Sequence, residues 1–246
     1  MFGGMVAGLR GGVKGERGKK TGGEGPADFS KIEANFNGIK TISARTETTL
    51  LNRSGRVDTK GRIMLDGKNR RRFDHIAPDR AVYIIDGDRY INYDFSEKKE
   101  VRKKLGELSS AHIIFLEEIF LDILHDPVNL LMRRYSFPAF RKGYRDIASP
   151  LAGVSLRDPA ARVAVHFNAN GITSIEYYFK GNLNKKTVFE DFAAIKGISV
   201  PTTMKTTIYV SPNVLMTVRL SEISINDQID DKFFRKRSEE HTSELQ

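Results

Sequence analysis

Residues 78–94 read PDRAVYIIDGDRYINYD, and this stretch decides the fold class. Residues 81–85 and 90–93 are rich in β-branched and aromatic side chains, which predicts two strands, and Pro78 marks a break before the first. Asp86-Gly87 lies between them and is one of the strongest short signals for a tight hairpin turn. The stretch therefore predicts an antiparallel hairpin.

Strand signals continue towards the N-terminus. Residues 41–51 and 56–65 are predicted as a second hairpin, and residues 70–76 as a highly charged strand that precedes Pro78. Ahead of them, residues 28–38 are predicted as a short helix with its apolar side chains on one face. The first half of the chain is therefore predicted to be mostly sheet.

The chain after the hairpin is predicted to interrupt the sheet with helices. Residues 96–104 are predicted as a basic connection, and residues 110–124 form the one clear helical interval. Residues 126–132 are predicted as a second short helix. The apolar side chains at helical spacing in the main interval are Ile113, Leu116, Phe120 and Ile123.

Strand signals return in the last third of the chain. A turn is predicted at residues 180–186, and a final stretch runs to Phe234. Strands far outnumber helices, and no strand is followed by its own crossover helix, so the sheet is predicted to be antiparallel. The predicted strands here are 162–167, 172–179, 187–192, 202–209 and 214–220.

The length of 246 residues and the hydrophobic content of 39% suit one domain, which we expect at residues 27–236. Residues 1–26 contain 10 of the 21 glycines and are predicted to be a disordered leader. Residues 237–246 resemble the in-frame translation of a sequencing-adapter oligonucleotide, so we assign them no function. The chain shows no signal peptide and no apolar run approaching the roughly 20 residues of a membrane span.

The chain is basic, with a formal net charge of +9 that becomes +11 without residues 237–246. This charge favours acidic partners, namely anionic lipid headgroups, nucleic acid or an acidic protein surface, and does not choose among them. The absence of cysteine excludes disulfides and thiol-based metal or redox sites.

Motifs of catalysis are missing. The lysine-rich segment at residues 15–21 lacks the glycine and hydroxyl spacing of a phosphate loop, and no GxSxG or HExxH pattern occurs. Glu117 and Glu118 are adjacent on a predicted helix and so point in different directions. We therefore expect no enzyme activity, no cofactor and no metal site.

The spacing around the hairpin carries a resemblance. Pro78 is followed eight residues later by Asp86-Gly87 and then by an aromatic strand that ends in Tyr93-Asp94, with Phe73 before the proline. Together with the order helix, strands, helical insert and strands over residues 29–234, this resembles the LolA-type periplasmic lipoprotein carriers. The resemblance implies a mainly β (α+β) fold, an incomplete and strongly curled antiparallel β-barrel with a helical lid.

Two further segments resemble this family, and one departs from it. Residues 61–65 resemble its glycine-started strand, and Gly197-Ile198 with Pro201 resembles a pattern near its C-terminus. The family often places Arg-Pro before its third strand, where this chain has Gly67 and Lys68. The arginine that holds the lid and takes part in cargo release is therefore not matched.

An apolar cavity is the predicted site, because alternation along a curled sheet sends one set of side chains inward. The same alternation is typical of a filled core, and only the resemblance favours a cavity. Acyl chains would be held there by burial alone. The residues predicted to line it are Phe73, Val82, Ile84, Tyr90 and Tyr93 of the sheet, with Ile113, Leu116 and Phe120 of the lid.

A basic cluster is the second predicted site. Lys68, Arg70, Arg71 and Arg72 are predicted to meet anionic headgroups or an acidic partner surface, and residues 98–104 form another basic run. The alternative interpretation of both basic segments is that they form a solvated face or protect a sheet edge from pairing by their charge.

The resemblance implies a non-enzymatic, monomeric carrier that moves the acyl chains of lipoproteins or lipids between membranes. Its implied partners are an inner-membrane donor complex and an outer-membrane acceptor, its implied compartment is the periplasm, and no nucleic acid is expected. A lipid-binding regulatory or sensor subunit on the same fold is the alternative, and a basic nucleic-acid-binding module is the third.

Overall fold

The computed structural model describes residues 34, 37–67, 69–109, 112, 116, 135–136, 146–150, 162–209 and 212–235. Two short helical turns, η1 (Leu105–Glu107) and α5 (Lys232–Arg235), accompany the strands. The strands are β1 (Thr41–Asn52), β2 (Gly55–Asp66), β3 (Arg70–Ala77), β4 (Ala81–Asp86), β5 (Arg89–Asp94), β6 (Lys99–Lys104), β7 (Tyr135–Ser136), β8 (Asp146–Pro150), β9 (Arg162–Asn168), β10 (Gly171–Phe179), β11 (Asn182–Ile195), β12 (Ile198–Ile208) and β13 (Val214–Ile225).

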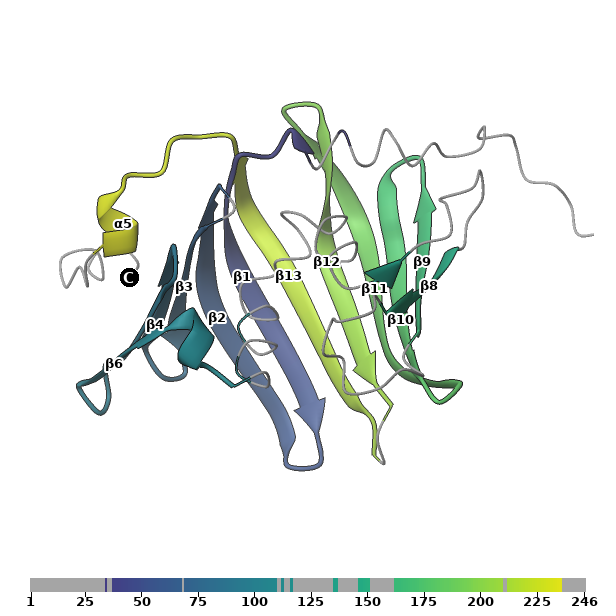
Figure 1. Cartoon of the computed structure of the whole chain (residues 1–246), viewed down its shortest axis with the longest axis horizontal. Helices are drawn as coiled ribbons and strands as arrows, with labels where there is room; N and C mark the ends of the chain where they lie inside the picture. The colour runs from purple at the N-terminus through teal and green to yellow at the C-terminus, as the bar shows by residue number, and fades with distance from the viewer. Residues whose placement is uncertain are drawn as a thin grey trace, which may run out of the picture.

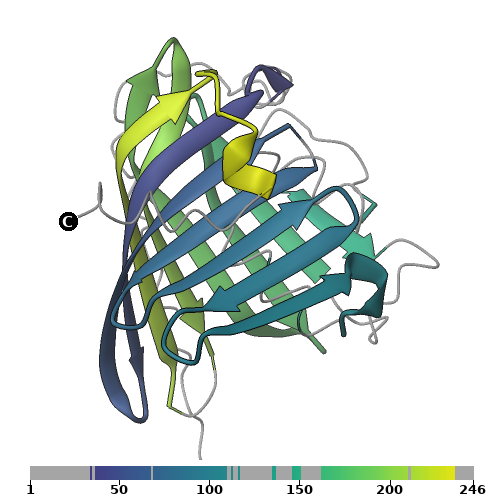
Figure 2. The same ribbon diagram turned by 90° about the vertical axis from the view of Figure 1, so that its left-hand side faces the viewer.

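These strands form one antiparallel sheet in the order β6-β5-β4-β3-β2-β1-β13-β12-β11-β10-β9-β8-β7 (Figure 1). The sheet curls so that its two halves, β2–β6 and β8–β12, form facing walls on either side of the central pair β1 and β13 (Figures 1 and 2). Within the described residues no pairing joins β6 to β7 or β8, so the sheet is not closed into a barrel. The predicted incomplete, curled antiparallel barrel is confirmed.

The sheet has an inner face, which lies between the two walls, and an outer face. Directly opposed residues of an antiparallel pair share a face, so the inner face can be followed across the sheet by its register. It carries the core, in which side chains from both walls pack as one cluster. Its fully buried members include Ile42, Ile63, Leu65, Tyr90, Val163, Val165, Phe167, Ile175 and Ile225.

Gly61 of β2 shows how local sequence shapes this face. A Cβ atom at this position would lie 2.7 Å from the Phe73 ring and 2.9 Å from the Asp74 carbonyl oxygen. The missing side chain therefore leaves the space into which the Phe73 ring of the neighbouring strand folds. This glycine begins the segment that resembles the LolA-type pattern, and it fixes where an aromatic ring lies on the inner face.

Most of the predicted strands are present, with three differences. Residues 96–104 were predicted as a connection but contain β6, an edge strand whose only apolar residue is Val101. Exposed cations suit such an edge, because charge discourages pairing with another chain. The predicted turn at 180–186 is only Lys180-Gly181, both at positive φ, and β11 begins at Asn182. The final stretch ends in the helical turn α5.

Some predictions fall on residues that the structure does not describe. The predicted leader, the tail and the helix at residues 126–132 lie outside the described residues. Of the helices predicted at residues 28–38 and 110–124, only isolated positions are described, among them Leu116, which is helical and buried in the core cluster.

A buried carboxylate on the outer face gives the fold an expected pH dependence. Glu176 accepts a hydrogen bond from the Tyr178 hydroxyl at 2.7 Å and pairs with Lys186 Nζ at 3.1 Å. Burial by itself would raise the pKa of Glu176. The contacts from Tyr178, Lys186 and His166 outweigh burial and lower its pKa to about 2.

Because the folded pKa of Glu176 lies below its unfolded value, its stabilising contribution is complete above pH 4.5 and is lost as the pH falls towards 2. We expect Glu176→Gln to lower the free energy of unfolding at pH 7 by about 1–3 kcal/mol. The loss should shrink as the pH falls to about 3, which urea unfolding of both proteins across this range would measure. A loss that does not change with pH would contradict this assignment.

Candidate functional site

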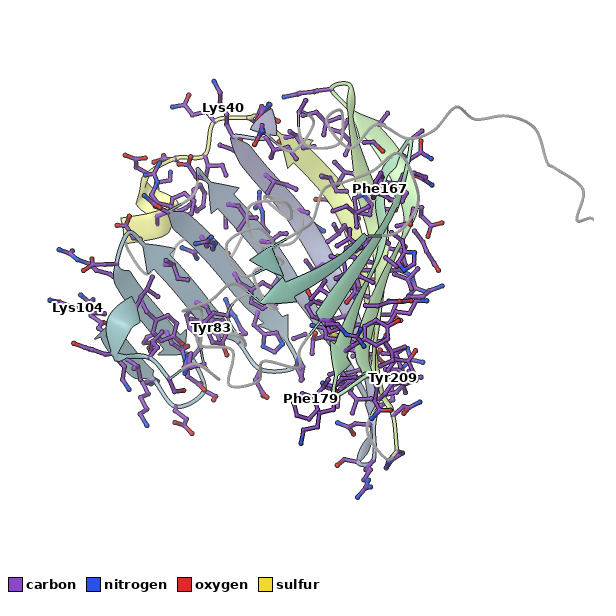
Figure 3. All side chains as sticks on the ribbon, turned by 45° about the vertical axis from the view of Figure 1, so that its right-hand side comes forward. Lys40, Tyr83, Lys104, Phe167, Phe179 and Tyr209 are labelled. Atoms are coloured by element: carbon purple, nitrogen blue, oxygen red, sulfur yellow. The ribbon has the colours of Figure 1, made fainter. Side chains whose placement is uncertain are left out.

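The candidate site is the inner face of strands β2–β5. Phe73 of β3 lies opposite Ile63 of β2 and Tyr83 of β4, and the Phe73 and Tyr83 ring centroids are 6.2 Å apart. Both rings are only partly buried, although they pack against the core cluster. Figure 3 labels Tyr83 on this wall of the sheet and Phe167 on the other. Large apolar side chains on this face therefore retain accessible surface.

Tyr90 of β5 continues this face beside Ile85. Its ring contacts the His112 ring edge-to-face at 5.1 Å, and its hydroxyl lies 3.1 Å from His112 Nε2. Burial raises the pKa of Tyr90 to about 12, and burial also raises the pKa of Tyr83. Both phenols are therefore neutral at physiological pH and add no charge to this face.

Few polar groups interrupt the apolar surface. Arg71 lies on the inner face between Leu65 and Ile85, and Asn92 lies opposite Tyr83. The Asn92 Oδ1 atom is buried without a hydrogen-bond partner among the described residues. The same register places His75 and Asp94 on this face, both opposite Ala81. A mainly apolar surface with a few polar groups suits an amphiphilic molecule.

The register divides the predicted cavity residues between the two faces. Val82 lies opposite Asp74 and Tyr93, and Ile84 lies opposite Arg72, which places all of them on the outer face. The prediction that Val82, Ile84 and Tyr93 share one surface with Phe73 and Tyr90 is therefore wrong. They are nevertheless buried, because the outer face of β3 and β4 is covered.

The cover on the outer face is the C-terminal turn α5, which packs against β3 and β4 (Figure 2). Arg72 is 4% exposed and donates from Nε to Asp74 at 2.7 Å and from Nη1 to the Phe233 carbonyl at 2.8 Å. Its guanidinium also lies 5.9 Å from the centre of the Phe233 ring. Arg72 is therefore a buried structural residue, and its predicted role in headgroup binding is wrong.

Arg70 belongs to the same outer contact. It pairs with Asp66 and donates to Asp231 at 2.6 Å, and its guanidinium lies 5.0 Å from the centre of the Phe234 ring. The hydrogen bond to Asp231 raises the pKa of Arg70. Of the predicted basic cluster, Arg71 lies on the inner face and Arg70 and Arg72 on the outer face, while Lys68 lies outside the described residues.

Of the predicted lid residues Ile113, Leu116 and Phe120, only Leu116 is among the described residues. Leu116 is 2% exposed and packs in the core cluster with inner-face residues. Ile113 and Phe120 lie outside the described residues, so their predicted roles stay predictions.

A separate hollow of about 980 Å³ lies against β4–β6 beside α5. Its lining mixes four cations with three carboxylates, and Ile91 and Phe234 supply apolar surface. Most of these residues belong to the outer face, and Tyr90 also belongs to the candidate site. The lining residues are Asp86, Asp88, Arg89, Tyr90, Ile91, Arg102, Lys103, Lys104, Glu107 and Phe234.

Two kinds of structural feature are absent from the described part of the chain. No helix there is long and apolar enough to cross a membrane. The described side chains also include no group of three or more histidines or carboxylates placed to hold a metal ion.

Comparison with known proteins identifies the fold. No protein-family model matches the chain, and no curated protein matches it. Among solved structures, a LolA superfamily protein from Nitrosomonas europaea superposes with a TM-score of 0.58 at 15% identity, covering 84% of this chain and 97% of that one. The chain has the LolA-type fold.

Two more solved structures share the LolA-type fold with this chain. A DUF1329 family protein from Desulfovibrio piger superposes with a TM-score of 0.59 at 14% identity and covers 86% of this chain and 98% of its own. A putative outer membrane lipoprotein-sorting protein domain from Vibrio parahaemolyticus superposes with a TM-score of 0.59 at 14% identity. The match covers 84% of this chain and 94% of that one.

Sequence reasoning missed several residues that the LolA-type sheet places on the inner face. Tyr83 is one of them, and the hairpin contained the signal that could have found it. Gly87-Asp88 is a two-residue loop closed by Asp86 and Arg89, which sets Tyr83 opposite Asn92 and Ile85 opposite Tyr90. The others are Ile63, Leu65, Ile85, Tyr177 and Met216.

Proposed function

We propose that this protein is a non-enzymatic carrier that binds acyl chains of a lipoprotein or lipid against the inner face of its curled sheet. The observation that supports this most is the set of large apolar side chains that remain partly exposed on that face. These are Phe73, Tyr83, Tyr177 and Met216. A filled core would bury such side chains, whereas a surface that receives a guest leaves them accessible.

Burial is sufficient to hold such a guest. Each methylene removed from water contributes about 0.8 kcal/mol, so about ten methylenes contribute about 8 kcal/mol before the cost of ordering the chain. No precise polar geometry is needed for this, which agrees with the few polar groups on the inner face. In this proposal Phe73 contacts the guest from the sheet, and Ile113 and Phe120 contact it from the lid, whereas Tyr90 and Leu116 are buried beneath this surface.

Arg71 is the residue we propose for the polar end of the cargo. It is the inner-face member of the predicted basic cluster and lies beside Leu65 and Ile85, so one molecule could contact the guanidinium and the apolar surface together. A guanidinium suits phosphate and carboxylate groups because it offers paired donors.

We extend the proposal to a monomer in the periplasm that exchanges cargo with an inner-membrane donor and an outer-membrane acceptor. The support is the shared fold of the Vibrio parahaemolyticus domain, which is named for outer membrane lipoprotein sorting.

Native mass spectrometry of the purified full chain tests the proposal. We expect co-purified lipid, or one-to-one uptake of an added diacylated peptide, and no uptake of the same peptide without acyl chains. A protein that carries no lipid and ignores the acylated peptide would refute the carrier function and identify the inner face as ordinary core.

A further inference from the structure

The exposed large apolar side chains gather at one end of the sheet. The tips of β1–β2, β10–β11 and β12–β13 all lie at the lower end in Figure 1. Every exposed large hydrophobic residue identified among the described residues belongs to these tips, with exposed fractions of 39–44%. They are Leu51, Val57, Phe179, Tyr209 and Leu215. Single exposed apolar residues are ordinary, but this confinement to neighbouring strand ends is not.

The register brings some of these residues into direct proximity. Leu51 of β1 lies opposite Leu215 of β13, so the first and last strands of the sheet present adjacent leucines. Tyr209 follows β12, and its backbone N–H donates to the Asn184 carbonyl at the start of β11. Figure 3 shows Phe179 and Tyr209 at the same end of the molecule and Lys40 at the opposite end. We call residues 51–57, 179–185, 208–209 and 212–215 the tip surface.

The charges on the tip surface are all positive. Its cations are Arg53, Arg56, Lys180 and Lys185, and its sequence contains no aspartate or glutamate. The Lys180 ammonium lies 5.3 Å from the centre of the Phe179 ring. Arg56 pairs with Asp58, just outside the surface, at 2.8 Å. At the opposite ends of the same strands the charges are mixed, since Asp66 pairs with Arg70 and Asp227 pairs with Lys196.

The exposed apolar side chains and the cations of the tip surface together favour one class of partner. Aromatic and aliphatic side chains interleaved with lysine and arginine are typical of surfaces that meet the headgroup region of a bilayer. Cations attract anionic headgroups, while the apolar side chains enter the boundary with the acyl chains. A second copy of the chain fits less well, because two such surfaces would bring like charges together.

We propose that the tip surface docks onto the surface of an anionic bilayer. This deepens the proposed function, since a carrier of acyl chains has to meet the membranes that supply and receive its cargo. The docking itself requires no cargo, so it can be measured apart from the carrier function.

Co-sedimentation of the full chain with lipid vesicles tests the proposal without any acylated ligand. We expect binding to phosphatidylcholine vesicles that contain phosphatidylglycerol to be at least about tenfold stronger than to phosphatidylcholine alone, and to weaken with added salt. Absence of binding to the anionic vesicles would overturn the proposal, as would self-association through this surface in its place. Neither result would bear on uptake of acylated peptide.

Matched variants locate the binding. Arg53→Glu with Lys180→Glu, and separately Leu51→Ser with Phe179→Ser, should each reduce vesicle binding by about tenfold or more. The control is Lys40→Glu with Arg89→Glu, which makes the same change of charge at exposed positions away from the tip surface. Figure 3 labels Lys40 at the opposite end, and the register places Arg89 beside Asp86, in line with Arg70 and Asp66 at the far end of β2. Equal losses in the control and the tip variants would overturn the assignment to the tip surface. All of the substituted positions are exposed, so the circular dichroism spectra of the variants should match that of the unchanged protein.

Discussion

Phe73→Glu is expected to abolish the uptake of a diacylated peptide while leaving the strand content intact. The Phe73 ring is partly exposed on the inner face and folds over Gly61, so a glutamate there would place a carboxylate against Ile63 and Tyr83. Burying that charge beneath an acyl chain costs several kcal/mol, which is comparable to what the chain contributes by its own burial. Native mass spectrometry with the acylated peptide measures the loss.

The matched control is Ile91→Glu. Ile91 has intermediate burial like Phe73, but it lies opposite Ile84 and therefore on the outer face. It should leave uptake of the acylated peptide unchanged. If Phe73→Glu fails to fold, Tyr83→Glu on the same face supplies the test. Normal uptake by a folded inner-face variant, or loss of uptake in Ile91→Glu, would contradict the assignment of the site to the inner face.

Arg72→Ala is expected to lower the free energy of unfolding by about 3–5 kcal/mol. The substitution would leave the Asp74 carboxylate buried without its closest cation and would remove the donor to the Phe233 carbonyl. Breaking a buried ion pair from one side is strongly destabilising, because the remaining charge stays out of water. Urea unfolding at pH 7 measures this loss.

Arg71→Ala is the control, because Arg71 lies on the inner face, on the side of the sheet away from α5. It should cost less than about 1 kcal/mol of stability. A double variant, Arg72→Met with Asp74→Leu, should regain part of the loss, because replacing both charges leaves neither unpaired. A loss of less than about 1 kcal/mol from Arg72→Ala would contradict the stabilising role of its contacts with Asp74 and Phe233.

The fold could be predicted because several local signals agree. Pro78, Asp86-Gly87 and the aromatic strand that follows indicate a hairpin on their own, and their spacing carries the resemblance to the LolA-type fold. β6 was missed because an edge strand needs few apolar residues, and Val101 alone provides no alternation. The length of the turn before β11 was wrong because Lys180 adopts a positive φ, which is uncommon outside glycine.

The candidate site was predicted less well, because the hydrophobicity of a side chain does not show whether it lies on the inner or the outer face of the sheet. Val82, Ile84 and Tyr93 are as apolar as the inner-face residues, but they are buried on the outer face, where α5 packs against β3 and β4. The contact that covers them joins Arg72 to Phe233, 161 residues later, and no local pattern indicates it. Counting from the two-residue hairpin loop would have separated the two faces of β4 and β5.

The pairing of β1 with β13 also determines when, during synthesis, the two halves of the sheet can join. All other neighbours in the sheet are consecutive strands, whereas this pair brings Ile42 against Ile225 across nearly the whole domain. Each half can form its hairpins from nearby residues, but the two halves join only after β13 has been synthesised. Closing so long a loop is slow, and the apolar inner faces stay open to water until then. The newly made chain therefore depends on protection from aggregation for longer than its simple order of hairpins would imply.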